Sequence, residues 1–144
     1  MAAFLISLDE YREATKKGRH KTKTGWRTIQ GQKLFFRSAW EANYARYLSF
    51  LKEQDLILAW LYEPKTFWFN AIKRGVRSYL PDFQVFELDG TYKWHEVKGY
   101  LDAKSKTKLK RMRIYYPEEC INLIDKSWFS KNGPKLKNFI QEWE

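Results

Sequence analysis

The stretch YLPDFQVFELDGTYKWHEVKG, residues 79–99, decides the expected fold of this chain. Two runs rich in β-branched and aromatic residues, Tyr79–Leu88 and Thr91–Lys98, flank the dipeptide Asp89-Gly90. This dipeptide between such runs is a strong signal for a tight hairpin turn. The two runs are therefore predicted to pair as antiparallel strands at the centre of a sheet.

Acidic and basic side chains meet across this hairpin. Side chains alternate along a strand, so Glu96 and Lys98 project from one face and Val97 from the other. Counting back from the turn places Asp82 roughly opposite Glu96 or Lys98. Carboxylate oxygens are ligands that Mg²⁺ prefers, so Asp82 and Glu96 are predicted to share a Mg²⁺, with the Val97 carbonyl as a third ligand. Lys98 is predicted to lie beside the attacking water, where its charge offsets charge that develops on a phosphate.

Helices and further strands are expected around the hairpin. Apolar residues at helical spacing predict a helix from Ser38 to about Gln54, and a lysine-rich helix is expected from about Asp102 to Tyr116. The other expected elements are a helix over Leu8–Lys17, one or two strands over Trp26–Phe36, strands over Leu56–Tyr62, Thr66–Ile72 and Cys120–Ile124, and a last helix after Asn132-Gly133-Pro134 that carries Leu136, Phe139, Ile140 and Trp143. The order of helix, three strands, helix and strand indicates an α/β fold.

Length and charge restrict the classes of protein to consider. The 144 residues suit a single domain over 26–144, preceded by an N-terminal helix and basic arm over 1–25. The formal net charge of +10 favours a polyanionic partner such as DNA. No apolar run is long enough to cross a bilayer, so no membrane role is expected. The single cysteine, Cys120, excludes an internal disulfide, fits a cytoplasmic protein, and is expected to be buried.

Basic residues beyond the hairpin are predicted to track a nucleic-acid backbone. They are Lys104, Lys106, Lys108, Lys110 and Arg111 on the lysine-rich helix, and Lys21 and Lys23 in the arm. The alternative for the helix is an ordinary solvated face. Aromatic side chains such as Trp60, Trp68 and Trp94 lie in apolar strand patterns and are predicted to be core residues.

These motifs resemble the PD-(D/E)xK nuclease superfamily, and most of all the phage junction-resolving endonuclease I group and related small phage nucleases. The likeness rests on Phe36-Arg37-Ser38-x-x-Glu41, Pro81-Asp82-Phe83 and Glu96-Val97-Lys98-Gly99, and it covers roughly Lys33 to Ile124. It implies a restriction-endonuclease-like core of helix, three-stranded antiparallel meander, helix and strand. It also implies catalytic roles for Asp82, Glu96 and Lys98, with Glu41 as an auxiliary carboxylate and metal ligand.

The function implied by this resemblance is a Mg²⁺-dependent DNA endonuclease, with Mn²⁺ able to substitute. Its expected substrate is branched DNA such as a Holliday junction, cut by a homodimer in a bacterial cell or phage-infected host. The alternatives are a transposon-end or replication nuclease, and a catalytically silent nucleic-acid-binding module on the same fold. Glu41 has a competing role, because Ser38-x-x-Glu41 is also the pattern of a capping box.

Overall fold

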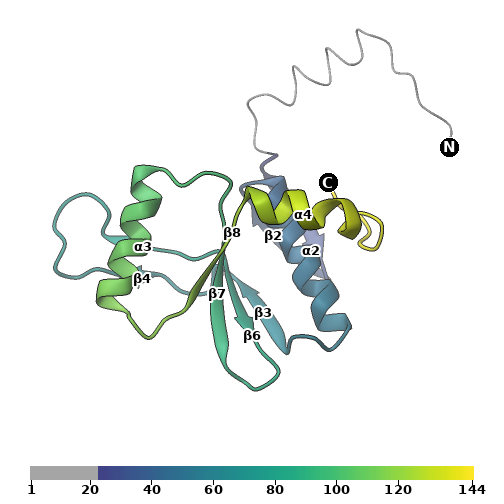
Figure 1. Cartoon of the computed structure of the whole chain (residues 1–144), viewed down its shortest axis with the longest axis horizontal. Helices are drawn as coiled ribbons and strands as arrows, with labels where there is room; N and C mark the ends of the chain where they lie inside the picture. Colours follow the sequence, from purple (N-terminus) through teal and green to yellow (C-terminus); the bar gives the residue numbers. More distant parts are fainter. Residues whose placement is uncertain (1–22) are drawn as a thin grey trace, which may run out of the picture.

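The structure, a computed structural model, describes residues 23–144 as a mixed α/β fold (Figure 1). The helix expected over Leu8–Lys17 and the arm residue Lys21 lie outside the described residues. Among residues 23–144, no helix combines the length and apolar character needed to cross a bilayer.

The main sheet has four strands in the order β3-β6-β7-β8. Their bounds are Ala59–Tyr62 for β3, Phe83–Phe86 for β6, Tyr92–Val97 for β7 and Ile121–Ile124 for β8. The first three strands are antiparallel, and β8 pairs in parallel with β7. The predicted hairpin is confirmed, since β6 and β7 are neighbours joined by the turn at Asp89-Gly90. Gly90 takes φ +86°, a conformation that L side chains rarely adopt.

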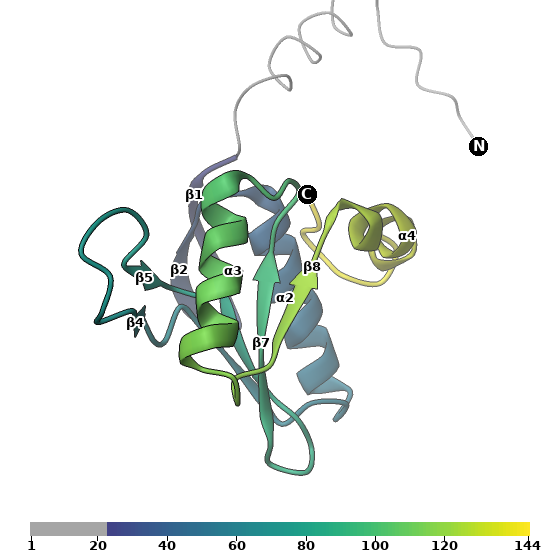
Figure 2. The same cartoon turned by 60° about the vertical axis from the view of Figure 1, so that its left-hand side comes forward.

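Two long helices lie on opposite sides of this sheet, as Figures 1 and 2 show together. Helix α2 spans Ala39–Glu53, and helix α3 spans Ala103–Tyr115. Both begin at a residue whose side chain accepts a backbone N–H of the first turn. Ser38 Oγ accepts from the Glu41 amide at 3.1 Å, and Asp102 Oδ1 accepts from the Ser105 amide at 2.7 Å. Both predicted helices are confirmed.

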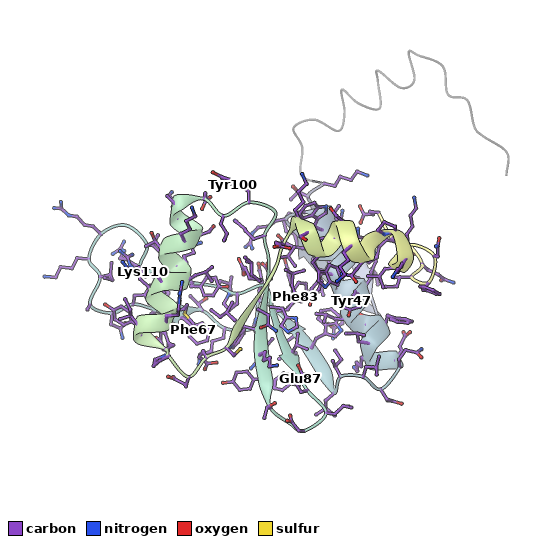
Figure 3. The ribbon with its side chains drawn as sticks, viewed as in Figure 1. Tyr47, Phe67, Phe83, Glu87, Tyr100 and Lys110 are labelled. Atoms are coloured by element: carbon purple, nitrogen blue, oxygen red, sulfur yellow. The ribbon has the colours of Figure 1, made fainter. Side chains whose placement is uncertain are left out.

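The main sheet contributes to two hydrophobic clusters, and Figure 3 labels one member of each, Phe83 and Phe67. The α2-side cluster includes Phe83, Val85 and Val97, and the α3-side cluster consists of Phe67, Phe69, Tyr79, Trp94 and Met112. Neighbouring residues of β7 therefore serve different clusters. Trp94 packs toward α3, whereas His95 faces α2, where its Nδ1 lies 2.6 Å from the Tyr44 hydroxyl.

Two short hairpins add to the main sheet. Strands β1 (Gly25–Ile29) and β2 (Gln32–Phe36) confirm the expected pair of strands. Strands β4 (Phe67–Trp68) and β5 (Ser78–Tyr79) form the other hairpin, so the strand expected over Thr66–Ile72 is much shorter than predicted. The run predicted as one strand, Tyr79–Leu88, is divided between β5 and β6 because Pro81 has no N–H to donate to a sheet.

The prediction for the last helix was wrong. Helix α4 spans Lys126–Leu136 and contains Asn132-Gly133-Pro134 instead of following it. It begins after Asp125, whose Oδ1 accepts from the Trp128 amide at 3.0 Å. The segment after it is fixed by its final residue, Glu144, whose carboxylate accepts two hydrogen bonds from Arg27, at 2.6 and 2.7 Å, and one from Arg46, at 2.9 Å.

Four further predictions concern burial. Trp94 is buried as expected, and Trp60 is partly buried in the α2-side cluster. Trp68 is 59% exposed, because β4 is a two-residue strand with one outward face. Cys120 is also exposed and is not the buried residue that was expected, because it precedes β8 and does not lie inside it.

Candidate metal and nucleic-acid site

Asp82 and Glu96 meet at one end of the main sheet. The register pairs Phe83 with His95, which sets Asp82 beside Glu96 as predicted from the turn. The Asp82 amide donates to Glu96 Oε2 at 3.2 Å, and the Val97 amide donates to Asp82 Oδ2 at 2.8 Å. Each carboxylate is thus fixed through one oxygen by the backbone of the neighbouring strand.

Glu41 approaches the same end of the sheet from the first turn of α2. Its Oε2 accepts from the Tyr62 hydroxyl at 2.9 Å and from the Arg37 amide at 3.2 Å. The Ser38 half of the predicted capping box is present, but Glu41 accepts the reciprocal hydrogen bond from the Arg37 amide and not from the Ser38 amide. Glu41 is buried, so its carboxylate belongs to the interior of the site and not to a solvated helix end.

Electrostatic repulsion and burial act on these acids together. Burial raises the pKa of Asp82 well above its usual value, and the charges of Glu96 and Glu41 raise it further. Burial also raises the pKa of Glu96, although hydrogen bonds from the Tyr79 hydroxyl and the Asp82 amide oppose the shift. Simultaneous ionisation of Asp82 and Glu96 is therefore disfavoured unless a cation offsets their charges.

No basic side chain of residues 23–144 forms an ion pair with these three acids. The ion pairs of this part of the chain join Arg27 and Arg46 to Glu144, and Arg37 to Glu63. Asp82 is only 5% exposed and Glu41 8%. Uncompensated buried charge is costly, so a bound cation or a shared proton is expected here.

Lys98 lies between two hollows beside the acids. A cleft of about 670 Å³ runs between the start of α2 and the end of β7, and Lys98 lines it together with Lys23, Arg37, Glu41 and Tyr100. On its other side, Lys98 lines a cavity of about 20 Å³ with Tyr79, Glu96 and Lys108. The charge of Lys98 lowers the pKa of Glu96. Lys98 and Glu96 line this cavity together, as expected for side chains on one strand face, and the role of Lys98 beside an attacking water stays a prediction.

The basic residues predicted on α3 divide into three groups. Lys104, Lys106 and Lys110 are exposed. Lys108 turns toward the acids, as its place in the small cavity shows. Arg111 donates through Nη1 to the Val76 carbonyl, so it holds the β4–β5 hairpin and is not a free surface cation. Of the two arm lysines, Lys23 reaches the larger cleft, and Lys21 lies outside the described residues.

The three carboxylates of the site provide some, but not all, of the ligands that a hard cation such as Mg²⁺ needs. Within residues 23–144, no group of three or more His, Cys, Asp or Glu side chains is placed to hold a metal ion as it stands. Each acid nevertheless has one oxygen fixed by the bonds above, and its other oxygen accepts no bond from residues 23–144. Oxygen ligands held in this way suit Mg²⁺, which keeps several waters and needs only one or two carboxylates.

Sequence patterns did not identify the phenols of the site. The Tyr79 hydroxyl donates to Glu96 Oε2 at 2.9 Å, and the Tyr62 hydroxyl donates to Glu41 Oε2. Both tyrosines stand two residues before a proline, Pro81 and Pro64, at a strand end. That recurrence is the one sequence signal that they share.

One comparison with known proteins identifies a family, and that family has no stated activity. The chain belongs to the DUF1064 family, described as a protein of unknown function, whose model matches residues 19–136. This range contains all the acids of the site, together with Lys98 and α3. No curated protein and no solved structure matches the chain.

Proposed function

We propose that this chain is a metal-dependent endonuclease that hydrolyses phosphodiester bonds of DNA and has a restriction-endonuclease-like core. The observation that carries the proposal is the pairing of the buried Asp82 with the partly buried Glu96, neither of which forms an ion pair with a basic side chain of residues 23–144. A chain of net charge +10 concentrates uncompensated negative charge at this one point. A divalent cation satisfies that charge and, when bound, supplies Lewis-acid activation of water and phosphate.

The residues of the site have distinct roles in this proposal. Asp82 and Glu96 hold the Mg²⁺ or Mn²⁺ ion, and Glu41 is an auxiliary ligand. A strand residue directs its N–H and C=O toward the same neighbour, so the Val97 carbonyl faces the side on which its amide meets Asp82. Lys98 orients the attacking water and stabilises negative charge on the scissile phosphate.

The surroundings of the site support a polyanionic substrate. Exposed lysines on α3 and the cations of the larger cleft approach the acids from two directions. Such cations neutralise phosphates and make binding depend on salt. Branched DNA, including four-way junctions, is the proposed substrate, and symmetric cutting of a junction requires a homodimer.

A second candidate is a nucleic-acid-binding module without catalytic activity. Two observations favour it. Each of the three acids already accepts a hydrogen bond, and residues 23–144 contain no group of three or more His, Cys, Asp or Glu side chains placed to hold a metal ion. In this case the acids only fix the strand ends, and the basic surface alone provides affinity.

The test compares cleavage of matched duplex, flap and four-way junction DNA with Mg²⁺, with Mn²⁺ and with chelator. Wild type should cut at least one substrate with metal only, and Lys98→Ala should lower the rate at least about 100-fold while binding changes little. Lys93→Ala is the matched control, because Lys93 lies on the same strand but away from the acids. If wild type binds these substrates tightly but cuts none of them, the nuclease proposal is refuted and the nucleic-acid-binding module becomes the better explanation.

A further inference from the structure

The larger cleft beside the acids has the size and lining of a pocket for one nucleotide. Its volume of about 670 Å³ lies within the usual range for small-molecule sites. The lining combines the aromatic side chains of Trp40 and Tyr100 with the cationic side chains of Lys23, Arg37 and Lys98. Aromatic faces bind bases and cations bind phosphates, so this lining matches both halves of a nucleotide.

One wall of the cleft is fixed by packing. The Trp40 ring stacks on Phe129, with ring centroids 4.7 Å apart and planes at 22°. The ring also lies close to Gly99, where an added Cβ would be 2.7 Å from Trp40 Cζ3. The stack on Phe129 and the close approach of Gly99 together hold Trp40 in place as one wall of the cleft.

The Tyr100 ring offers a free aromatic face at the mouth of the cleft. It is 79% exposed, on the connection from β7 to α3, at the end of the molecule where both long helices begin (Figure 3). Among residues 23–144, it stacks on no other ring and forms no hydrogen bond. Glu41 and Lys98 line the same cleft, so a group bound there lies next to the proposed reaction centre.

We propose that this cleft binds an unpaired nucleotide of a DNA strand, with its base on Tyr100 and its phosphates beside Lys23 and Arg37. The inference rests on the proposed function and names the substrate class. A base inside a duplex is stacked on both faces, so only an unpaired or extruded base can meet the ring. The preferred substrates are therefore a bulge, a flap or an open junction, and a continuous duplex is disfavoured.

The test measures binding in chelator, where cutting does not interfere. The probes are a duplex with one unpaired 2-aminopurine and a matched duplex with the same base paired. Wild type should bind the bulged probe more tightly and quench its fluorescence. Tyr100→Phe should retain both effects, whereas Tyr100→Leu should lose the quenching and bind the bulge about 5- to 10-fold more weakly, the size expected for one lost base stack.

Phe139→Leu is the matched control, because Phe139 is 69% exposed but lines a different hollow, beside Glu53 and Gln54. Equal binding and quenching by wild type and Tyr100→Leu would overturn the nucleotide pocket, even if DNA is cut. If binding of the bulged probe depends on Tyr100 but no divalent metal supports cleavage, the nucleotide pocket is supported and the nuclease proposal is refuted. The two proposals can therefore fail separately.

Discussion

The backbone amide of Asp82 donates a hydrogen bond to Glu96 Oε2 over 3.2 Å, which joins the main chain of one acid to the side chain of the other. Asp82 is buried and Glu96 is partly buried, and the pKa values of both are raised. The fold therefore brings like charges together with a defined geometry, and without a cation this arrangement lowers stability at neutral pH.

Asp82→Asn is expected to stabilise the protein in the absence of metal. A group whose folded pKa is raised loses stability as pH rises above its unfolded value, so removal of the charge at pH 8 should raise the free energy of unfolding by about 1 kcal/mol or more. The asparagine oxygen can still accept from the Val97 amide. Thermal unfolding in chelator measures the effect, and Glu118→Gln, at an exposed acid, should change little.

The same variant should lose its response to divalent cations. Millimolar Mg²⁺ or Mn²⁺ is expected to raise the melting temperature of wild type, because a ligand that binds only the folded state stabilises it. Asp82→Asn should show no such rise, and Glu118→Gln should keep it. A rise of the same size in Asp82→Asn would show that the cation binds elsewhere.

Gly99→Ala is expected to disturb the Trp40 wall. The new Cβ would lie 2.7 Å from the ring, so the ring or the strand end must shift, at a cost of about 1–3 kcal/mol. Gly133→Ala is the control, since its Cβ would meet nothing closer than 4.0 Å and it lies inside α4. Urea unfolding measures both variants. Trp40→Leu should remove most of the penalty of Gly99→Ala in a double-mutant cycle, and additive effects would contradict the steric explanation.

His95 should make the protein sensitive to mild acid. Burial lowers the pKa of His95 from 6.5 to about 4, and within residues 23–144 its Nε2 has no hydrogen-bond partner. Between pH 6.5 and pH 4, His95 takes up a proton only in the unfolded chain. The free energy of unfolding should therefore fall by up to about 3 kcal/mol as the pH drops from 6.5 toward 4. His95→Gln should fall less over the same range by urea unfolding, while Tyr44 keeps an acceptor. Equal slopes for both proteins would refute the assignment.

Glu144→Gln is expected to loosen the segment after α4. Hydrogen bonds from Arg27 and Arg46 lower the pKa of Glu144 to about 2. The contribution of this carboxylate to the free energy of unfolding is therefore present above pH 4.5 and is lost as the pH falls toward 2. Loss of its charge at pH 7 should cost on the order of 1 kcal/mol, since it leaves the buried Arg46 short of a partner. Glu142→Gln, two residues away, should be neutral by the same urea measurement.

The sequence predicted the parts of the fold that depend on local signals. The turn at Asp89-Gly90 determines the register of β6 and β7, and with it the meeting of Asp82 and Glu96. Ser38 and Asp102 mark helix starts by their side-chain chemistry. The same kind of signal at Asp125 was overlooked in favour of the breakers Gly133 and Pro134, which α4 tolerates near its end.

The remaining features depend on contacts between residues far apart in the chain. Tyr62 and Tyr79 bond to acids that lie 21 and 17 residues away, and no periodicity reports such pairs. The exposure of Trp68 depends on where the short β4–β5 hairpin lies, which its apolar pattern does not specify. Glu144 reaches back to Arg27 across 117 residues, a contact that only the folded chain creates.

The β4–β5 hairpin is a separate two-stranded sheet, and this separation bears on how the family can diversify. Tyr79 of β5 donates to Glu96 at the site, and Arg111 on α3 donates to the Val76 carbonyl near the end of the connecting loop. The loop over residues 70–77 pairs with no strand of the main sheet. Insertions in this loop would change the reach of Lys73 and Arg74 without moving Asp82 or Glu96. Under the proposed function, the contacts with a nucleic acid and the arrangement of the acids would therefore lie in segments that can evolve independently.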